Sequence, residues 1–403
     1  MGEPDSRSKT PVPAGLSVPL LLPVIYALGS NGSGQLGLGH TEDVARAEKC
    51  LFRPLQKDIP SHPSGIRCEV GLKKIVAGGN HSVLLMNDSR VFVAGHFPGS
   101  EENSSVDFLE REFKFDERYG GVITDVAATW EATFVVVDQR AIFGCGKGEK
   151  GELGLGMDVV QAEQMTRVFD VDDLDLRPGG GGCKIIAIAA SMAHVVVLLS
   201  NGQVLGWGSC RKGQLGEEVK KEKVLWKPAR IDVSNDGVRM LPFAPDGVAL
   251  GREYTVFIKR GQRPVIWGVT KSFNDGELEQ VVHEDDVLLS GWSSIHVLSA
   301  PTQIGCLVRS MGRNDRGQLA PSNLPPIHAL AAGSEHCVAL HSDNQIIAWG
   351  WGEHGNCGEE LDAKGNVVGR WNVIPLPRLL EGTSVKSVAA GCATSFVVCQ
   401  GDG

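Results

Sequence analysis

Two short patterns of apolar residues alternate along the whole chain. The first is an apolar run that ends in a glycine turn, as in VIYALGSNGSGQLGLG from Val24 and AIFGCGKGEKGELGLG from Ala141. The second is an apolar run that opens on a turn of small residues, as in IVAGGNHSVLL from Ile75 and LAAGSEHCVAL from Leu330. Short runs of this kind, rich in β-branched residues and bounded by Gly, Asn and Asp, predict repeated antiparallel hairpins.

Each pattern occurs seven times, and the spacing indicates the architecture. The first pattern recurs after 66, 51, 62, 60, 44 and 38 residues, counted between its leading glycines Gly29, Gly95, Gly146, Gly208, Gly268, Gly312 and Gly350. Units of this size fit the blades of a β-propeller, whose closure removes the open sheet edges of separate hairpins. A solenoid is the competing topology, but the polar capping repeats that it needs are missing. We therefore predict an all-β, seven-bladed propeller.

The two ends of the chain fit a closed ring. The chain enters the first pattern at Tyr26 and leaves the second pattern at Cys399. One blade can therefore be completed only if N-terminal and C-terminal strands pair. We expect a single propeller over residues 24–400, preceded by a flexible tail over residues 1–23.

The composition shows an excess of glycine and argues against several classes of function. The 403 residues include 51 glycines, well above the usual frequency of about 7 %, and we assign the excess to turns with positive φ and to close backbone contacts near the axis. The net charge of −9 argues against a surface built for nucleic acid or anionic lipid. The apolar segment 18–25 is too short to span a membrane and contains two prolines.

The ten cysteines show no CxxC pair and no zinc-ligand spacing. Most lie in apolar runs, which favours reduced core thiols in a soluble intracellular protein. We expect no metal site and no cofactor. The insertions at residues 41–70, 100–120 and 157–182 are rich in acidic residues, Pro and Gly, and we expect solvated surface loops there, with a mobile loop at VFDVDDLDLRPGGGG.

The paired repeats resemble the RCC1 family of seven-bladed propellers over about residues 24–400. Several segments are most similar to the fungal alpha-tubulin suppressor, or killer-toxin-insensitivity, branch of that family. They are GSNGSGQLGLGHTED from Gly29, GGNHSVLL from Gly78, GWSSIHVL from Gly291, GSEH from Gly333, WGWGEHGNCG from Trp349 and AGCATSFVV from Ala390.

The resemblance implies a non-catalytic partner protein. Propellers of that branch form a heterodimer with a small CSL-type zinc protein, an electron carrier of diphthamide synthesis. The pair serves diphthamide formation on elongation factor 2 and Elongator-dependent modification of wobble uridine in tRNA. The resemblance therefore implies the CSL-type zinc protein and Elongator as partners. It implies no direct contact with nucleic acid or membrane, and it implies a location in the cytoplasm and in the nucleus.

Alignment of the second pattern predicts a ring of residues around one mouth of the channel. Large residues stand in this column at Trp130, Met192, Arg252 and Trp292, where small ones would suffice. Such residues are typical interface anchors, although the two tryptophans could equally plug the channel. The next column contains carboxylates, among them Glu131 and Glu335, so we expect a partner with basic edges.

Two further groups of repeat residues need separate interpretations. His81, His194 and His336 recur in the third column and are expected to link turns structurally. Trp351, Glu353 and His354 lie in a turn that departs from the repeat, which we place on the other side of the propeller. We expect Trp349 in the core and Trp351 and His354 near the surface, in a binding or a structural role.

Enzyme signatures are missing from the sequence. There is no P-loop, GxSxG elbow or HExxH motif, and the GxG steps lie between strands. The leading hypothesis is therefore a non-enzymatic interaction propeller. The alternative is a guanine-nucleotide exchange factor for a Ran-type GTPase, against which stand the acidic balance and the lack of a basic N-terminal tail. A third class of function, a propeller that inhibits an enzyme by plugging its active site, fits the fold. It does not fit an intracellular chain with ten cysteines that show no sign of pairing.

Overall fold

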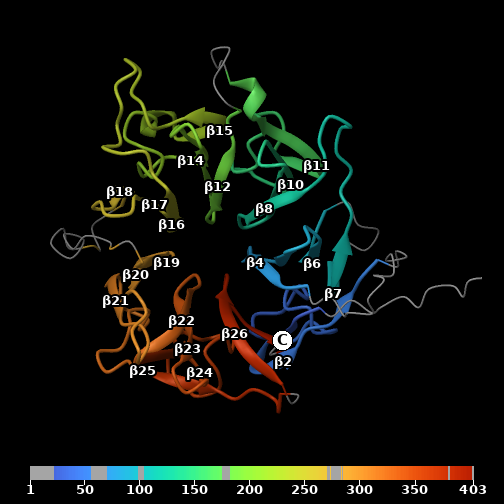
Figure 1. The fold of residues 1–403 in the computed structure, drawn as a ribbon, viewed down its shortest axis with the longest axis vertical. Coiled ribbons are helices and arrows are strands. Elements are labelled where there is room, and N and C mark those ends of the chain that lie inside the picture. Colours follow the sequence, from blue (N-terminus) through green and yellow to red (C-terminus); the bar gives the residue numbers. More distant parts are fainter. Residues whose placement is uncertain are drawn as a thin grey trace, which may run out of the picture.

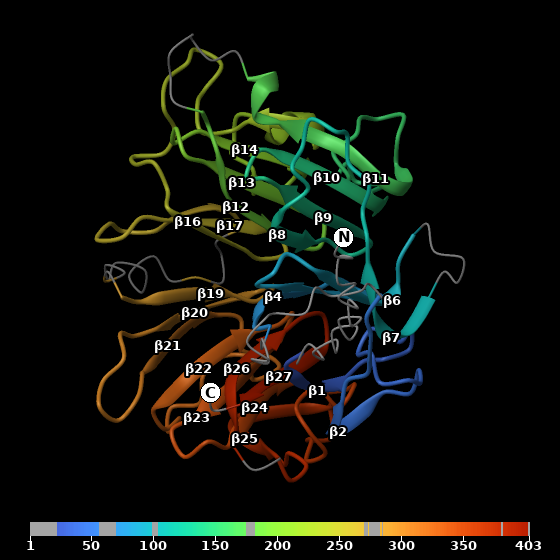
Figure 2. The ribbon, with the colours of Figure 1, turned by 45° about the vertical axis from the view of Figure 1, so that its right-hand side comes forward.

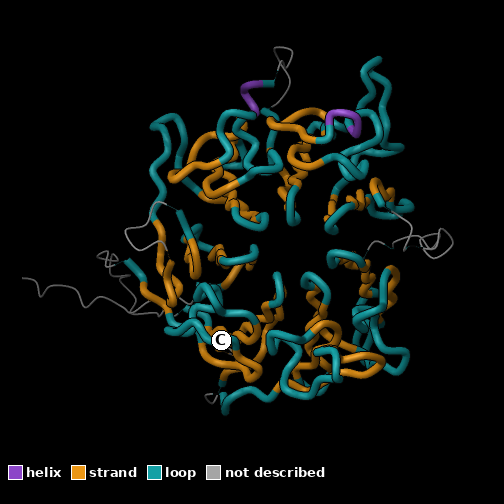
Figure 3. The backbone as a smooth tube through the Cα atoms, turned by 180° about the vertical axis from the view of Figure 1, so that it is seen from behind, coloured by secondary structure: helices purple, strands orange, loops and turns teal. Residues whose placement is uncertain are grey.

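The computed structural model describes residues 22–55, 70–98, 104–174, 182–269, 273, 283, 285–379 and 382–401. Its strands form seven sheets arranged around a central axis (Figure 1). A view of the molecule turned by 45° about the vertical axis shows the sheets as separate blades (Figure 2). Strands and loops make up nearly all of the described chain (Figure 3), with the 3-10 turns η1 (Val171–Asp173) and η2 (Lys220–Glu222). The predicted all-β, seven-bladed propeller is confirmed.

Each blade begins with a strand beside the axis, and the blades are named here after that strand. The innermost strands are β4 (Leu72–Ala77), β8 (Ile123–Ala128), β12 (Ile185–Ala190), β16 (Gly247–Leu250), β19 (Val287–Ser290), β22 (Ile327–Ala332) and β26 (Thr383–Ala390). The second strands are β5 (His81–Met86), β9 (Ala132–Val137), β13 (His194–Leu199), β17 (Tyr254–Ile258), β20 (Ser294–Leu298), β23 (His336–His341) and β27 (Thr394–Gly401).

The outer strands complete the blades. The third strands are β6 (Val91–His96), β10 (Ala141–Lys147), β14 (Val204–Ser209), β18 (Val265–Gly268), β21 (Val308–Gly312), β24 (Ile346–Trp351) and, in the β26 blade, β1 (Val24–Gly29). The fourth strands are β7 (Ser104–Arg111), β11 (Gln161–Asp170), β15 (Val224–Arg230), β25 (Asn366–Ile374) and β2 (Val44–Lys49). The β16 and β19 sheets have three strands in the described chain, and β3 (Phe52–Arg53) pairs with β7 in the β4 blade.

The ring is closed by pairing between the two ends of the chain. Strand β1 pairs antiparallel with β27, from Val24 opposite Cys399 to Gly29 opposite Thr394. The sheet order β2-β1-β27-β26 therefore combines N-terminal and C-terminal strands in one blade. This confirms the predicted closure, which leaves no blade-sized gap in the ring.

The leading glycines are required by the backbone at the end of every third strand. All seven have φ between +87° and +117°. A Cβ on any of them would lie within 2.6 Å of the carbonyl oxygen of the turn that it faces, and at Gly146 within 2.1 Å of the Glu131 carbonyl. Both the positive φ and the close approach exclude other residues. The glycine excess is therefore structural at these positions.

Apolar side chains fill the wedges between neighbouring blades. Leu36, Leu153 and Leu215 from the repeated glycine turns are fully buried there. The equivalent Leu319 is only half-buried. The core thus consists of a series of inter-blade clusters that hold the innermost strands, and with them the turns at the channel, in place.

The insertions are more regular than the sequence suggested. Residues 41–70, 100–120 and 157–182 contain the outer strands β2, β7 and β11, which pair with the third strands of their blades and so cover edges that would otherwise be open. Residues 175–181 of the expected mobile loop, with three of its four glycines, and most of the expected N-terminal tail lie outside the described residues. The nine cysteines in the described chain are free thiols, and eight are buried. No helix among the described residues is long and apolar enough to cross a membrane.

Candidate functional site

The turns between the first and second strands of the blades meet at one end of the channel, called here the mouth face. Hydrogen bonds join their backbones from blade to blade. Gly79 donates to the Trp130 carbonyl at 2.8 Å, and Trp130 donates to Met192 at 3.3 Å. Arg252 donates to Trp292 at 3.0 Å, and Trp292 donates to Ser334 at 2.7 Å. The structure therefore places the first column predicted from the repeats side by side around the mouth.

Trp130 and Trp292 meet across the channel. They come from the β8 and β19 blades, three positions apart in the ring, yet their ring centroids are 6.0 Å apart with an interplanar angle of 42°. Both side chains are half-buried. Tilted aromatic pairs at this distance attract each other in addition to the area that they bury.

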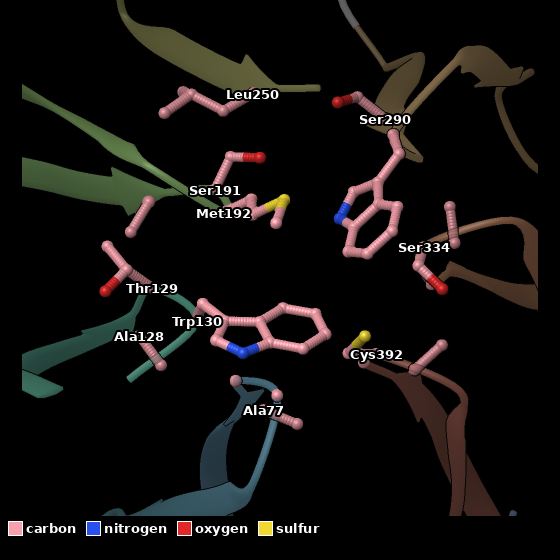
Figure 4. A pocket seen from close by; sticks show the side chains of 18 residues that line it. Ala77, Ala128, Thr129, Trp130, Ser191, Met192, Leu250, Ser290, Ser334 and Cys392 are labelled. Atoms are coloured by element: carbon pink, nitrogen blue, oxygen red, sulfur yellow. The ribbon is translucent and has the colours of Figure 1, made fainter. Parts of the chain in front are cut away.

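The tryptophan pair borders a pocket of about 130 Å³ at the mouth. Trp130, Met192 and Cys392 extend into it from three different blades (Figure 4). The remaining lining is mostly small residues, which leave the indoles room to contact another molecule. Burial raises the pKa of the Cys392 thiol to about 11, so this thiol stays protonated at neutral pH and is a poor nucleophile.

The charged residues of the mouth face differ in the contacts that they make within the chain. The exposed Arg252 guanidinium lies over Trp292, 5.6 Å from the ring centroid. Glu335 accepts hydrogen bonds from Ser293 Oγ at 2.6 Å and from Gln318 Nε2 at 2.9 Å. The exposed Glu131 lies at the edge of a second pocket, of about 160 Å³, between the β4 and β8 blades. The mouth is therefore aromatic and of mixed charge.

Trp351 lies on the mouth face and not on the other side of the propeller. Its backbone N–H donates to the carbonyl of Glu335 at 2.8 Å. The expected opposite location was wrong because strand direction reverses twice between the two turns. The turn after the first strand and the turn after the third strand of a blade consequently lie at the same end.

The turn around Trp351 combines aromatic and charged side chains. Trp351 Nε1 donates to Glu353 Oε2 at 3.1 Å, and the His354 ring meets the indole edge-on at 5.2 Å. His354 Nδ1 lies 2.8 Å from Asp43 Oδ2, which connects this turn to the β26 blade. Trp351 is half-buried and Trp349 is completely buried, as the sequence predicted.

The recurring histidines are structural. His81, His194 and His336 are buried and hydrogen-bonded to hydroxyls of the neighbouring blade, through Thr133 at 2.8 Å, Thr255 at 3.1 Å and Ser395 at 3.0 Å. Burial lowers the pKa of His81 and of His336 to about 4, and that of His194 to about 3. They are therefore neutral at physiological pH and tie the blades together.

Sequence reasoning missed Arg316, whose guanidinium lies over the Trp351 ring, 4.9 Å from its centroid. A signal was present in the repeat. The turn GSNGSGQ, beginning at Gly29, becomes GRNDRGQ, beginning at Gly312, so that Arg313 and Arg316 replace two serines. In the described chain, no group of three or more His, Cys, Asp or Glu residues is placed to hold a metal ion.

Comparison with known proteins agrees with this architecture. The model of the regulator of chromosome condensation (RCC1) repeat matches residues 24–85 and 327–356. An RCC1 repeat-containing protein of Schizosaccharomyces pombe is 28% identical over 94% of this chain and 99% of its own length. The secretion-regulating guanine nucleotide exchange factor of Mus musculus is 25% identical over 94% of this chain and 84% of its own length.

The same fold occurs in a solved structure. Prp20p of Saccharomyces cerevisiae, described with its binding to Gsp1p and histones, superimposes with a TM-score of 0.70 at 18% identity, covering 96% of this chain and 93% of that one. Residues 24–85 and 327–356 therefore match RCC1 repeats, and the described chain has the fold of an RCC1-like propeller.

Proposed function

We propose that this propeller is a non-catalytic interaction protein that docks a small CSL-type zinc protein on its mouth face. In this role it supports diphthamide synthesis on elongation factor 2 and Elongator-dependent modification of wobble uridine. The proposal rests on one observation above all. Two half-buried tryptophans from distant blades, Trp130 and Trp292, meet at the mouth with Arg252 on the face of one of them.

These residue types favour protein recognition over a purely structural plug. A plug needs only apolar volume, whereas a guanidinium stacked on an indole keeps its N–H edge available for a partner. Tryptophan and arginine are also the residues most enriched among those that dominate interface energies. The partner's identity comes from the resemblance of WGWGEHGNCG and its companion segments to the fungal branch named above.

Exchange of guanine nucleotide is the second candidate function. It is favoured by the name of the mouse relative, a guanine nucleotide exchange factor that is similar to 94% of this chain. The acidic net charge of −9 distinguishes the chain from a chromatin-docked exchange factor, because a surface that binds DNA phosphates must be basic.

One experiment separates the two candidates. The tagged full-length chain is purified from its own cells, and its stoichiometric partners are identified by mass spectrometry. The purified chain is then tested for nucleotide release from a Ran-type GTPase. Recovery of the zinc protein at equal amounts with no accelerated release supports the interaction propeller. Release at catalytic amounts without the zinc protein overturns it in favour of exchange.

A further inference from the structure

Two guanidinium groups lie over indole rings of the mouth face. Arg252 covers Trp292 at 5.6 Å between its Cζ and the ring centroid, and Arg316 covers Trp351 at 4.9 Å. A cation–π contact of this kind holds the guanidinium near the ring while its N–H groups remain available to hydrogen-bond acceptors. Each stack therefore presents oriented donors to whatever approaches the face.

The two stacks are connected through Glu335. Ser293, which follows Trp292, donates its hydroxyl to Glu335 Oε2 at 2.6 Å. The Glu335 carbonyl accepts the Trp351 backbone N–H at 2.8 Å. The five residues Arg252, Trp292, Glu335, Trp351 and Arg316 thus form one continuous feature across the β16, β19 and β22 blades, called here the arginine–tryptophan stripe.

The carboxylates along the stripe already have partners. Glu335 accepts from Ser293 and from Gln318 Nε2 at 2.9 Å, and Glu353 accepts from Trp351 Nε1 at 3.1 Å. Asp315 pairs with Arg313, and this pairing helps to lower the pKa of Asp315 although burial opposes it. These interactions reduce the attraction of the carboxylates for a basic partner.

The stacked arginines are different. Within the described chain, neither Arg252 nor Arg316 has a carboxylate within ion-pair distance. Glu253, which follows Arg252, lies 4.0 Å from Lys212 Nζ, and the oxygens of Glu335 and Glu353 already accept hydrogen bonds. The guanidinium N–H groups of Arg252 and Arg316 are therefore the charged donors along the stripe that no carboxylate of the described chain engages.

A pocket of about 320 Å³ lies beside the stripe and has space for a side chain. Its charged lining consists of Arg252, Arg313, Glu253 and Glu335, and its aromatic lining of Tyr254, Phe273 and Trp292.

We propose that the arginine–tryptophan stripe binds an acidic segment of a protein partner, whose carboxylates pair with Arg252 and Arg316 while adjacent apolar side chains pack on Trp292 and Trp351. Arginine is suited to this role because its planar fork matches a carboxylate with two parallel hydrogen bonds. This inference rests on the proposed interaction function and specifies the chemistry of the partner. It reverses the basic edge that the carboxylate-rich second column suggested.

The test uses the full chain and two kinds of ligand. The first is a fluorescein-labelled peptide of alternating glutamate and leucine, compared with a lysine–leucine peptide and with a single-stranded oligonucleotide by fluorescence anisotropy. The second is the purified CSL-type zinc protein. The variant carries Arg252→Gln and Arg316→Gln. Its matched control carries Arg118→Gln and Arg239→Gln, which remove the same charge outside the stripe. Arg118 also lies over an aromatic ring, with its Cζ 4.9 Å from the centroid of Tyr119.

We expect the acidic peptide to bind the wild-type chain and to lose about tenfold or more of its affinity in the stripe variant, because charge-assisted hydrogen bonds are removed. The control variant should keep its affinity. Tighter binding of the lysine peptide or of the oligonucleotide would overturn the inference, as would an equal loss in the control. If the zinc protein binds wild type and stripe variant equally, the inference fails and the proposed function stands. If the zinc protein does not bind wild type at all, the proposed function fails.

Discussion

Trp351 donates its backbone N–H to the carbonyl of Glu335 at 2.8 Å, and this bond places two candidate groups on one surface. Glu335 belongs to the ring of turns around the channel, and Trp351 belongs to the outer turn of the same blade. The residues singled out from the repeats therefore form one face that extends from the channel to the rim of the β22 blade.

The two tryptophans of strand β24 provide a matched pair for separating stability from binding. Trp349 is fully buried, with Nε1 donating to the Gln318 carbonyl at 3.3 Å, whereas Trp351 is half-buried at the surface. Trp349→Ala should lower the free energy of unfolding by about 3–5 kcal/mol. Trp351→Ala should cost much less stability but should weaken partner binding. Urea denaturation and titration calorimetry measure the two effects, and the reverse assignment would contradict the proposed role of Trp351.

The pair at the channel mouth is tested by replacing both indoles. Trp130→Ala combined with Trp292→Ala should weaken partner binding by about 2 kcal/mol or more, which is roughly 30-fold in Kd. Calorimetric titration provides the affinity, and differential scanning calorimetry provides the Tm. Unchanged affinity with a lowered Tm would identify the two tryptophans as a channel plug.

Gly146 and Gly182 test why the repeat needs glycine. Gly146 has φ of +109°, and a Cβ there would lie 2.1 Å from the Glu131 carbonyl oxygen, whereas a Cβ at Gly182 meets nothing within 4 Å. Gly146→Ala should destabilise the fold by more than about 1 kcal/mol, because conformational strain and steric clash both oppose it. Gly182→Ala should leave the urea midpoint nearly unchanged. Equal effects would show that the close approach at Gly146 is not what selects glycine.

The buried histidines predict the pH dependence of stability. His81, His194 and His336 have pKa values lowered to about 4, 3 and 4 in the folded state, against about 6.5 in the unfolded chain. The unfolded chain therefore binds more protons between pH 6.5 and pH 4, so stability should be constant above this window and fall as the pH falls through it.

A single substitution checks the origin of that slope. His336→Asn removes one titrating group while keeping a side chain that can hydrogen-bond to Ser395. Urea denaturation at several pH values should give a shallower loss of stability for His336→Asn than for wild type, even if the variant is less stable at pH 7. An unchanged slope would mean that other groups cause the acid sensitivity.

Much of the fold followed from the sequence because the leading glycines mark a backbone conformation that few other residues tolerate. They gave the number of blades, and the positions of Tyr26 and Cys399 gave the closure between β1 and β27. The fourth strands were harder to predict. The first eight residues of β11 are all exposed or half-buried, without a regular alternation, so the apolar pattern is weak at the outer edge of a blade.

The candidate site was only partly predictable. Repeat alignment placed Trp130 and Trp292 in one column, but contact between them depends on how far each side chain reaches across the channel. The stacking of Arg316 on Trp351 joins the β19 and β22 blades, and such lateral contacts depend on the rotation between blades. No repeat pattern within a single blade contains that information.

Hydrogen–deuterium exchange of the chain alone and in complex with the CSL-type zinc protein shows which end of the channel the partner covers. We expect protection on the mouth face, at residues 129–131, 291–293, 333–335 and 351–354. Protection confined to turns at the opposite end of the channel, such as residues 138–140, 200–203 and 342–345, would contradict it.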